Sequence, residues 1–170
     1  MPRSFELVAE SPATVEQVHG AFQRRDYWLA RLATFTGVNT LESLVVDDDG
    51  TVKVATTQDL RDQALPGVLK VLPANLKLFR TETWKPEGER RVRGEVTVSA
   101  PGRLGSGSAE ALIAPTPHGS RLTFAGTMAV KLPLVGGRIE QYIGGQLAEE
   151  IPTLQQFTSQ WIGEHGGAPT

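Results

Sequence analysis

The stretch Leu132-Pro133-Leu134-Val135-Gly136-Gly137-Arg138-Ile139-Glu140 opens the segment that decides the fold. From there, apolar residues recur at three- and four-residue steps, which is the spacing of one helix face. The residues that follow this spacing are Ile139, Tyr142, Ile143, Leu147, Ile151, Leu154, Phe157 and Trp161. The pattern predicts a C-terminal helix of roughly 25 residues that bends near Pro152, because proline removes one backbone hydrogen bond. Gly163 marks its expected end.

The chain before this helix follows a different period. Segments rich in β-forming residues, several of them alternating apolar and polar side chains, are separated by turn signals such as Asp-Gly and Pro-Glu-Gly. They span residues 3–9, 40–46, 51–60, 76–84, 91–98, 108–114 and 121–131. Their spacing of about a dozen residues predicts an antiparallel sheet.

Three helical segments interrupt the predicted strands. One carries Val15, Val18 and Phe22 on a single face, and a second begins near Asp26 as its N-cap and ends before Gly37. A third, over residues 65–72, is short and apolar. This third helix either packs on the core or covers an opening.

Two motifs are candidates for ligand sites. A helix–loop–helix calcium loop alternates its acidic ligands, whereas Asp47, Asp48 and Asp49 are contiguous and precede a glycine, which favours a hairpin turn. The glycine-rich run 102–108 lacks the lysine of a phosphate-binding loop, and Glu110 stands where a dinucleotide fingerprint needs glycine. We therefore interpret the run as a strand connection.

Composition excludes several classes of function. The 170 residues include 17 Lys and Arg against 19 Asp and Glu, so the net charge of −2 gives no broad basic field for nucleic acid. The absence of cysteine excludes thiol catalysis and cysteine-ligated metal sites. His19, His118 and His165 lie in separate elements, and no Gly-x-Ser-x-Gly motif occurs. We predict no metal, no cofactor and no assignable catalytic residue.

The expected organisation is one domain over residues 1–166 with a flexible tail at 167–170. The chain shows no signal peptide and no apolar run of the roughly 20 residues that a membrane span needs. We therefore expect a cytoplasmic protein.

A mixed set of side chains on the predicted strand 76–84 bears on function. Leu78, Arg80, Glu82 and Trp84 share one face by the two-residue period. This face is either solvated or the semi-polar wall of a ligand cavity. If buried, Glu82 needs a partner, such as Arg80 or a cross-strand donor.

The pair Gly144-Gly145 in the C-terminal helix poses a similar choice. Glycine in a helix interior costs up to ~1 kcal/mol relative to alanine, so a structural reason for the pair is expected. The pair either allows close packing on the sheet, which we favour, or leaves room for a ligand.

The order of elements, a strand, two short helices, six strands and a long helix, resembles the helix-grip fold of the START-like (SRPBCC) superfamily. Residues 81–84, 65–73 and 132–140 carry the resemblance, which covers residues 3–163. The superfamily includes lipid-transfer START domains, polyketide cyclases and plant pathogenesis-related proteins; the chain resembles more narrowly a mostly actinobacterial group of unassigned function. The resemblance implies an α+β fold, in which a curved seven-stranded antiparallel sheet wraps around the long C-terminal helix.

The same resemblance implies a cavity between sheet and helix that takes an apolar ligand. We therefore predict binding of a small hydrophobic or lipid-like molecule. The predicted contacts are Trp84, Phe124 and Met128 on the sheet; Ile139, Tyr142 and Ile143 on the helix; Gln58, Arg80 and Glu82 at a polar end; and Leu69 and Leu72 at the entrance. The alternatives are a cyclase or aromatase with Glu82 as acid or base, and a protein-interaction module without a ligand.

Overall fold

A computed structural model describes residues 3–35, 37–60, 67, 70, 72–73 and 76–165. In chain order the elements are β1 (Arg3–Ser11), α1 (Val15–Phe22), α2 (Arg25–Leu32), β2 (Val38–Val46), β3 (Val52–Asp59), β4 (Lys77–Glu87), β5 (Arg91–Ser99), the short 3₁₀ helix η2 (Pro101–Arg103), β6 (Gly105–Thr116), β7 (Gly119–Val130) and α3 (Gly136–His165). The predicted helix 65–72, apart from isolated residues, and the tail 167–170 lie outside the described residues.

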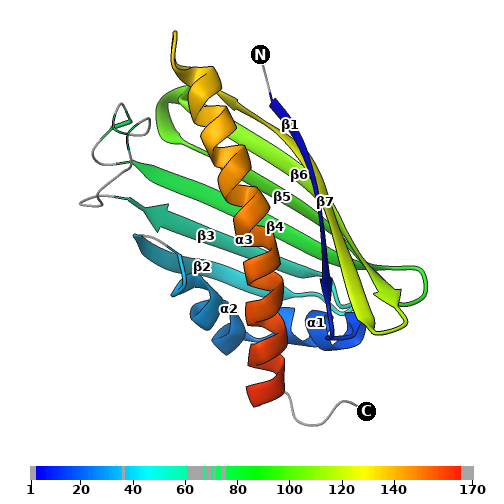
Figure 1. The fold of residues 1–170 in the computed structure, drawn as a ribbon. Coiled ribbons are helices and arrows are strands. Elements are labelled where there is room, and N and C mark those ends of the chain that lie inside the picture. The colour runs from blue at the N-terminus through cyan, green and yellow to red at the C-terminus, as the bar shows by residue number, and fades with distance from the viewer. Residues whose placement is uncertain are drawn as a thin grey trace.

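The strands form one seven-stranded sheet in the order β1-β7-β6-β5-β4-β3-β2. Every neighbouring pair is antiparallel, and β1 joins the sheet beside the last strand. Helices α1 and α2 carry the chain from the β1 edge to the β2 edge, and α3 runs across the inner face of the curved sheet (Figure 1). This is the α+β helix-grip fold expected from the sequence.

Local sequence signals explain where the first helices begin. The Thr14 side chain accepts a hydrogen bond from the Gln17 backbone N–H, and the Gln17 side chain accepts one from the Thr14 N–H, a capping box. The expected N-cap of α2 was wrong: the helix starts at Arg25, and Arg24 is its extended N-cap residue. Asp26 lies inside the first turn, where its carboxylate accepts hydrogen bonds from Arg24.

The acidic run between β2 and β3 is a hairpin turn, as predicted. The Asp47 N–H donates to the Thr51 carbonyl at 2.8 Å, and Asp49 Oδ1 accepts from the Thr51 N–H at 2.9 Å. Gly50 adopts a φ of 88°, a left-handed conformation that glycine takes without steric cost. Asp49 thus completes the turn.

The glycine-rich run is more structured than predicted. Strand β6 begins at Gly105 and pairs from there with Val130 of β7. A Cβ on Gly105 would lie 2.9 Å from the Ala129 carbonyl oxygen, so glycine permits this close approach of two backbones.

The hydrophobic core occupies the end of the sheet that α1, α2 and the C-terminal half of α3 cover. The ring centroid of Phe22 lies 5.0 Å from that of Trp84 and 5.4 Å from that of Trp28, and the ring centroids of Tyr27 and Trp161 are 5.2 Å apart. Such tilted and T-shaped aromatic pairs add stability beyond their buried area. These rings join α1, α2, the sheet and α3 into one packed body.

Helix α3 is longer than expected, at 30 residues, and Pro152 lies inside it on an exposed position. Its apolar face follows the predicted spacing, with Ile139, Ile151, Leu154 and Trp161 buried. Among the described helices, none combines the length and hydropathy of a membrane span.

Candidate functional site

The predicted site residues within the described part of the chain come from the sheet, the first two turns of α3 and the segment before β4. They are Gln58 on β3, Arg80, Glu82 and Trp84 on β4, Phe124 and Met128 on β7, Ile139, Tyr142 and Ile143 on α3, and Leu72. Antiparallel register and the two-residue period put the sheet residues on one face. Leu72 is half-buried, and Leu69 lies outside the described residues.

Trp84 belongs to the filled end of this face. It pairs with Val52 on β3 and with Gly94 on β5, and all three are buried. A Cβ on Gly94 would overlap the Trp84 indole, so glycine at this position lets the ring lie across the neighbouring strand. In the same cross-strand row, Phe124 stacks on Phe5 with a centroid distance of 5.7 Å. These rings form part of the packed core.

The other end of the same face is more open. On the sheet, Gln58 and Arg80 are half-buried, and on α3 the same holds for Tyr142 and Ile143. The larger aromatic rings lie at the other end of the face, where they are buried. Gly144 lies on the buried face of α3, four residues after the buried Glu140. No described atom lies within 4 Å of the position that a Cβ on Gly144 would occupy. Our expectation that this glycine allows close packing was therefore wrong: it borders open space.

Glu82 marks the boundary between the two ends. It is 4% exposed and pairs with Val54 and Val96, two apolar neighbours. Its partner is neither Arg80 nor a cross-strand group, because the Trp84 indole N–H donates to Glu82 Oε1 at 3.2 Å. The face is thus not simply solvated: it contains a buried carboxylate.

Sequence reasoning missed a polar chain that reaches the same region from α2. Arg31 Nη1 donates to the Tyr27 hydroxyl oxygen at 3.0 Å. The Thr158 hydroxyl donates to the Leu154 carbonyl, so the Tyr27 hydroxyl must donate its own proton to Thr158 Oγ1, 2.6 Å away. No sequence motif links these residues, since they lie on α2 and α3.

Arg31 is held over aromatic rings as well as by Tyr27. Its guanidinium carbon lies 5.1 Å from the Trp28 ring centroid and 5.8 Å from that of Phe22. Burial disfavours its charge, but Tyr27 and Glu82 outweigh this effect and raise the pKa of Arg31 above its usual value. Glu82 is therefore one of the groups that stabilise the charge of Arg31.

A second opposite-charge pair lies farther along the open end. Desolvation raises the pKa of Glu150 on α3 above its usual value; the positive charge of Arg80 opposes this shift and the neighbouring Glu149 reinforces it. The Arg80 guanidinium carbon lies 5.7 Å from the Phe35 ring centroid. The open end thus combines apolar, aromatic and compensated charged groups.

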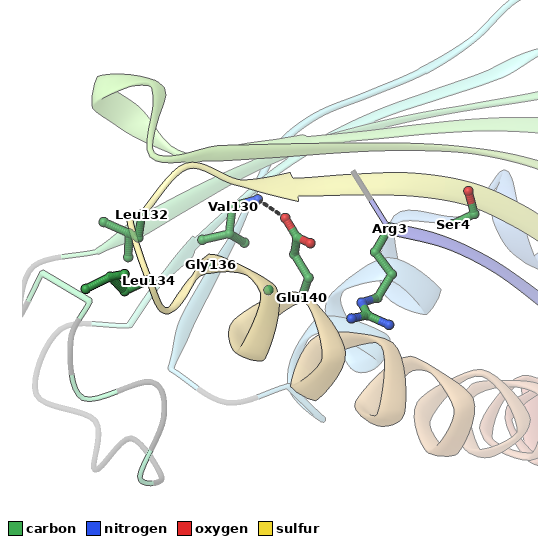
Figure 2. A pocket seen from close by; sticks show the side chains of 8 residues that line it. Arg3, Ser4, Val130, Leu132, Leu134, Gly136 and Glu140 are labelled. Carbon is green, nitrogen blue, oxygen red and sulfur yellow. Dashed lines mark hydrogen bonds between the residues drawn. The ribbon is translucent and has the colours of Figure 1, made fainter. Parts of the chain in front are cut away.

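A separate hollow of about 600 Å³ lies where β1 begins, β7 ends and α3 starts. Figure 2 shows Glu140 pointing to the end of β7, where its Oε2 accepts a hydrogen bond from the Val130 N–H at 2.8 Å, and Arg3 reaching from β1 over α3. The predicted site residues that the structure describes do not line this hollow. Here the buried Glu140 ties the start of α3 to the sheet.

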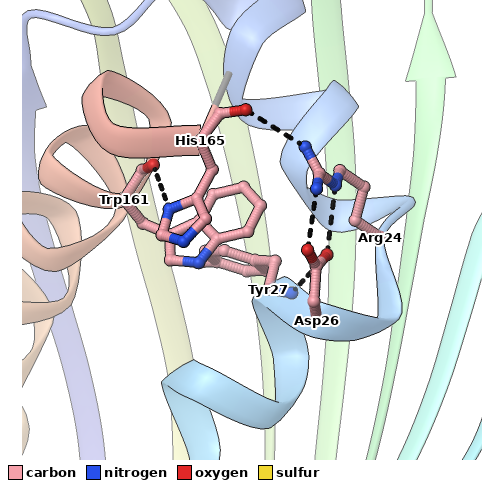
Figure 3. A network of polar contacts seen from close by, with 5 residues as sticks. All are labelled: Arg24, Asp26, Tyr27, Trp161 and His165. Carbon is pink, nitrogen blue, oxygen red and sulfur yellow. Dashed lines mark hydrogen bonds and ion pairs between the residues drawn. The ribbon is translucent and has the colours of Figure 1, made fainter. Parts of the chain in front are cut away.

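A cluster of side chains at the surface joins the C-terminal end of α3 to the start of α2 (Figure 3). Arg24 forms a two-pronged contact with Asp26, at 3.0 and 2.7 Å, and its guanidinium carbon lies 4.9 Å from the Trp161 ring centroid. His165 stacks on Trp161 at 4.4 Å. The hydrogen bonds from Arg24 lower the pKa of Asp26 below its usual value. Within the described residues, no group of three or more His, Asp or Glu could hold a metal.

Residues 6–162 match the protein family described as Protein of unknown function (DUF2505). The chain belongs to this family. An uncharacterized protein of Mycobacterium tuberculosis is 41% identical over 173 residues, covering 95% of this chain and 98% of the relative, and one from Mycobacterium bovis matches equally. The resemblance to an unassigned, mostly actinobacterial group is therefore confirmed.

Solved structures share the helix-grip fold of this DUF2505 protein. A protein of Rhizobium leguminosarum superposes with a TM-score of 0.58 at 10% identity, covering 94% of this chain and 96% of that one. Norcoclaurine synthase of Thalictrum flavum, in complex with dopamine and hydroxybenzaldehyde, gives a TM-score of 0.52 at 14% identity, covering 97% and 88%. At these identities the likeness shows the fold alone.

Proposed function

We propose that this DUF2505 protein binds a small hydrophobic or lipid-like molecule between the inner face of the sheet and the first half of α3. The observation that carries the proposal is the open space beside Gly144, on the buried face of the helix. Protein interiors are normally packed to the density of organic crystals. Space left between a sheet and its covering helix is therefore a natural place for a ligand.

The side chains around this space fit such a ligand. Leu78, Val98 and Leu147 supply half-buried apolar surface, and Gln58 supplies a polar group. Binding sites for small molecules are mostly apolar with a few placed polar groups. Burying about 200 Å² of apolar ligand surface would contribute ~5 kcal/mol before the entropy cost of association, at ~25 cal/mol per Å².

The fold is compatible with this role. The norcoclaurine synthase structure described above contains dopamine and hydroxybenzaldehyde, so a protein of similar fold holds small aromatic molecules. This likeness supports the general capacity and leaves the chemistry of the ligand to the residues of this chain.

The proposal is tested by blocking the space. Gly144→Phe would project a ring into it, whereas Gly145→Phe places the same ring on an exposed position of the same helix. The two variants thus change helix propensity and apolarity alike. Nile red, a neutral apolar dye, reports binding by its fluorescence. We expect saturable binding to the wild type, weakened by about tenfold or more in Gly144→Phe and retained in Gly145→Phe.

Two results of the dye experiment would contradict the proposal. Absence of saturable dye binding to the wild type, or equal binding by both variants and the wild type, would contradict the proposed site. Circular dichroism melts of both variants check that the helix still forms, so that loss of binding is not loss of fold.

A further inference from the structure

The boundary between the packed core and the open space holds a carboxylate with an unused oxygen. Glu82 Oε1 accepts the Trp84 indole N–H, but Oε2 accepts no hydrogen bond from the described residues. Among these residues, Gln155 Nε2 is the only side-chain polar atom that is both sealed from solvent and without a partner. Glu82 Oε2 also has no hydrogen-bond partner in the described part of the chain, but it is not one of these sealed atoms. It therefore retains some exposure to solvent.

Arg31 presents unused donors to the same region. Its Nη1 group donates to the Tyr27 hydroxyl, and no other hydrogen bond joins its guanidinium to a described residue. Arg31 and Glu82, both within the described chain, interact through their charges but form no ion pair within 4.0 Å. Tyr27 and the aromatic rings beneath Arg31 hold the guanidinium, so it does not collapse onto the carboxylate.

The position of the pair relates it to the ligand space. On β4, Glu82 lies one cross-strand row inward of the half-buried Arg80 and one row outward of the buried Trp84. A ligand that enters from the open end therefore meets Glu82 and Arg31 where the packed core begins. It would find an acceptor on Glu82 and donors on Arg31, two residues linked through the packed rings of Trp84 and Phe22.

We propose that the bound molecule carries a neutral polar group of the hydroxyl type, which donates to Glu82 Oε2 and accepts from Arg31. This inference rests on the proposed function and names the chemistry of its ligand. A hydroxyl group is both donor and acceptor, so it satisfies the two protein groups at once. Hydrogen bonds to charged partners are about twice as strong as neutral ones.

Charged ligands are disfavoured by the same arrangement. A carboxylate would gain from Arg31 but be repelled by Glu82, and an ammonium group would face the reverse. The opposite charges of Arg31 and Glu82 offset each other, so a charged ligand of either sign does not recover the cost of leaving water. The site should therefore select neutral hydroxylated molecules over fatty-acid-like anions and over amines.

Four probes that share a naphthalene body test this selectivity. They are naphthalene, 2-naphthol, 2-naphthoate and 2-(aminomethyl)naphthalene, which at neutral pH are apolar, neutral hydroxylated, anionic and cationic. Dissociation constants from isothermal titration calorimetry would be compared for the wild-type protein. We expect 2-naphthol to bind about tenfold more tightly than naphthalene, and both charged probes to bind more weakly than 2-naphthol.

Variants of the pair should shift the preference in opposite directions. Glu82→Gln leaves Arg31 uncompensated and should favour 2-naphthoate, whereas Arg31→Met leaves Glu82 uncompensated and should favour the ammonium probe. Glu164→Gln and Arg25→Met make the same changes in net charge at exposed positions and should preserve the wild-type order. A merely structural role of the pair would weaken all probes together.

Each outcome separates this inference from the proposed function. If naphthalene binds as tightly as 2-naphthol, or the two variants show the same order of probes, the hydroxyl inference is wrong while apolar binding stands. If none of the probes binds the wild type, the inference is also overturned, and the Nile red experiment with Gly144→Phe decides separately on the function. The wild-type order alone tests the inference if a variant does not fold.

Discussion

Replacing Tyr27 by phenylalanine would remove one oxygen from the chain that links α2 to α3. The Tyr27 side chain is fully buried, and its hydroxyl accepts from Arg31 and donates to Thr158. The ring contacts with Trp28 and Trp161 would remain, because phenylalanine keeps the ring. The change therefore isolates two hydrogen bonds, one to a charged group and one between neutral groups.

We expect Tyr27→Phe to lower the free energy of unfolding by about 2 kcal/mol. The hydrogen bond from the charged Arg31 contributes more than the neutral one to Thr158. Arg31 is half-buried, so water replaces part of the interaction that it loses. Urea unfolding followed by tryptophan fluorescence would measure it. Thr158→Val should cost about 1 kcal/mol, and the double variant less than the sum of both, because the residues share one network. A loss below about 0.5 kcal/mol for Tyr27→Phe, or strict additivity, would refute the hydrogen-bond chain.

Three further predictions test other parts of the structure. Gly94→Ala should lower the free energy of unfolding by about 1–3 kcal/mol, because the new methyl group overlaps the indole packed on that position; an unchanged urea midpoint would contradict this. Gly144→Ala and Gly145→Ala should each raise the free energy of unfolding by about 0.5–1 kcal/mol, since both gain helix propensity and neither new Cβ contacts a described atom. A lower free energy of unfolding in Gly144→Ala alone would argue against open space at this position. Asp26 has a lowered pKa in the folded state, so its contribution is present above its usual pKa of 3.8 and lost as pH falls through the folded-state value. The stability difference between wild type and Asp26→Asn, measured by urea unfolding, should therefore shrink from neutral pH to about pH 2.5, and a constant difference would contradict the assignment.

The elements that could be predicted are those whose signals are local. The three- and four-residue spacing from Ile139 to Trp161 identified α3, and Asp-Gly between two β-like runs identified the β2–β3 turn. Errors arose where tertiary contacts decide. Asp26 has the residue type of an N-cap, but Arg24 binds its carboxylate, and the helix begins at Arg25, two residues earlier than an N-cap at Asp26 implies.

The candidate site was only partly within reach of the sequence. The two-residue period placed Arg80, Glu82 and Trp84 on one face, but periodicity does not say whether a face is solvated or buried. Arg31 was missed because its approach to Glu82 depends on how α2 packs against the sheet. The pattern of α2 alone shows an ordinary exposed arginine in the last turn of a short helix.

By itself, the sequence determined the type and order of the elements, because hydrogen bonding within a helix and pleating within a strand impose periods on neighbouring residues. It also determined which chemistries are absent, since a chain without cysteine has no thiolate to offer. Only the tertiary structure decided that Gly144 borders open space and that the charge of Glu82 acts on Arg31. Both depend on distances between segments far apart in the chain, which arise from the curvature of the sheet and the packing of α2 and α3 on it.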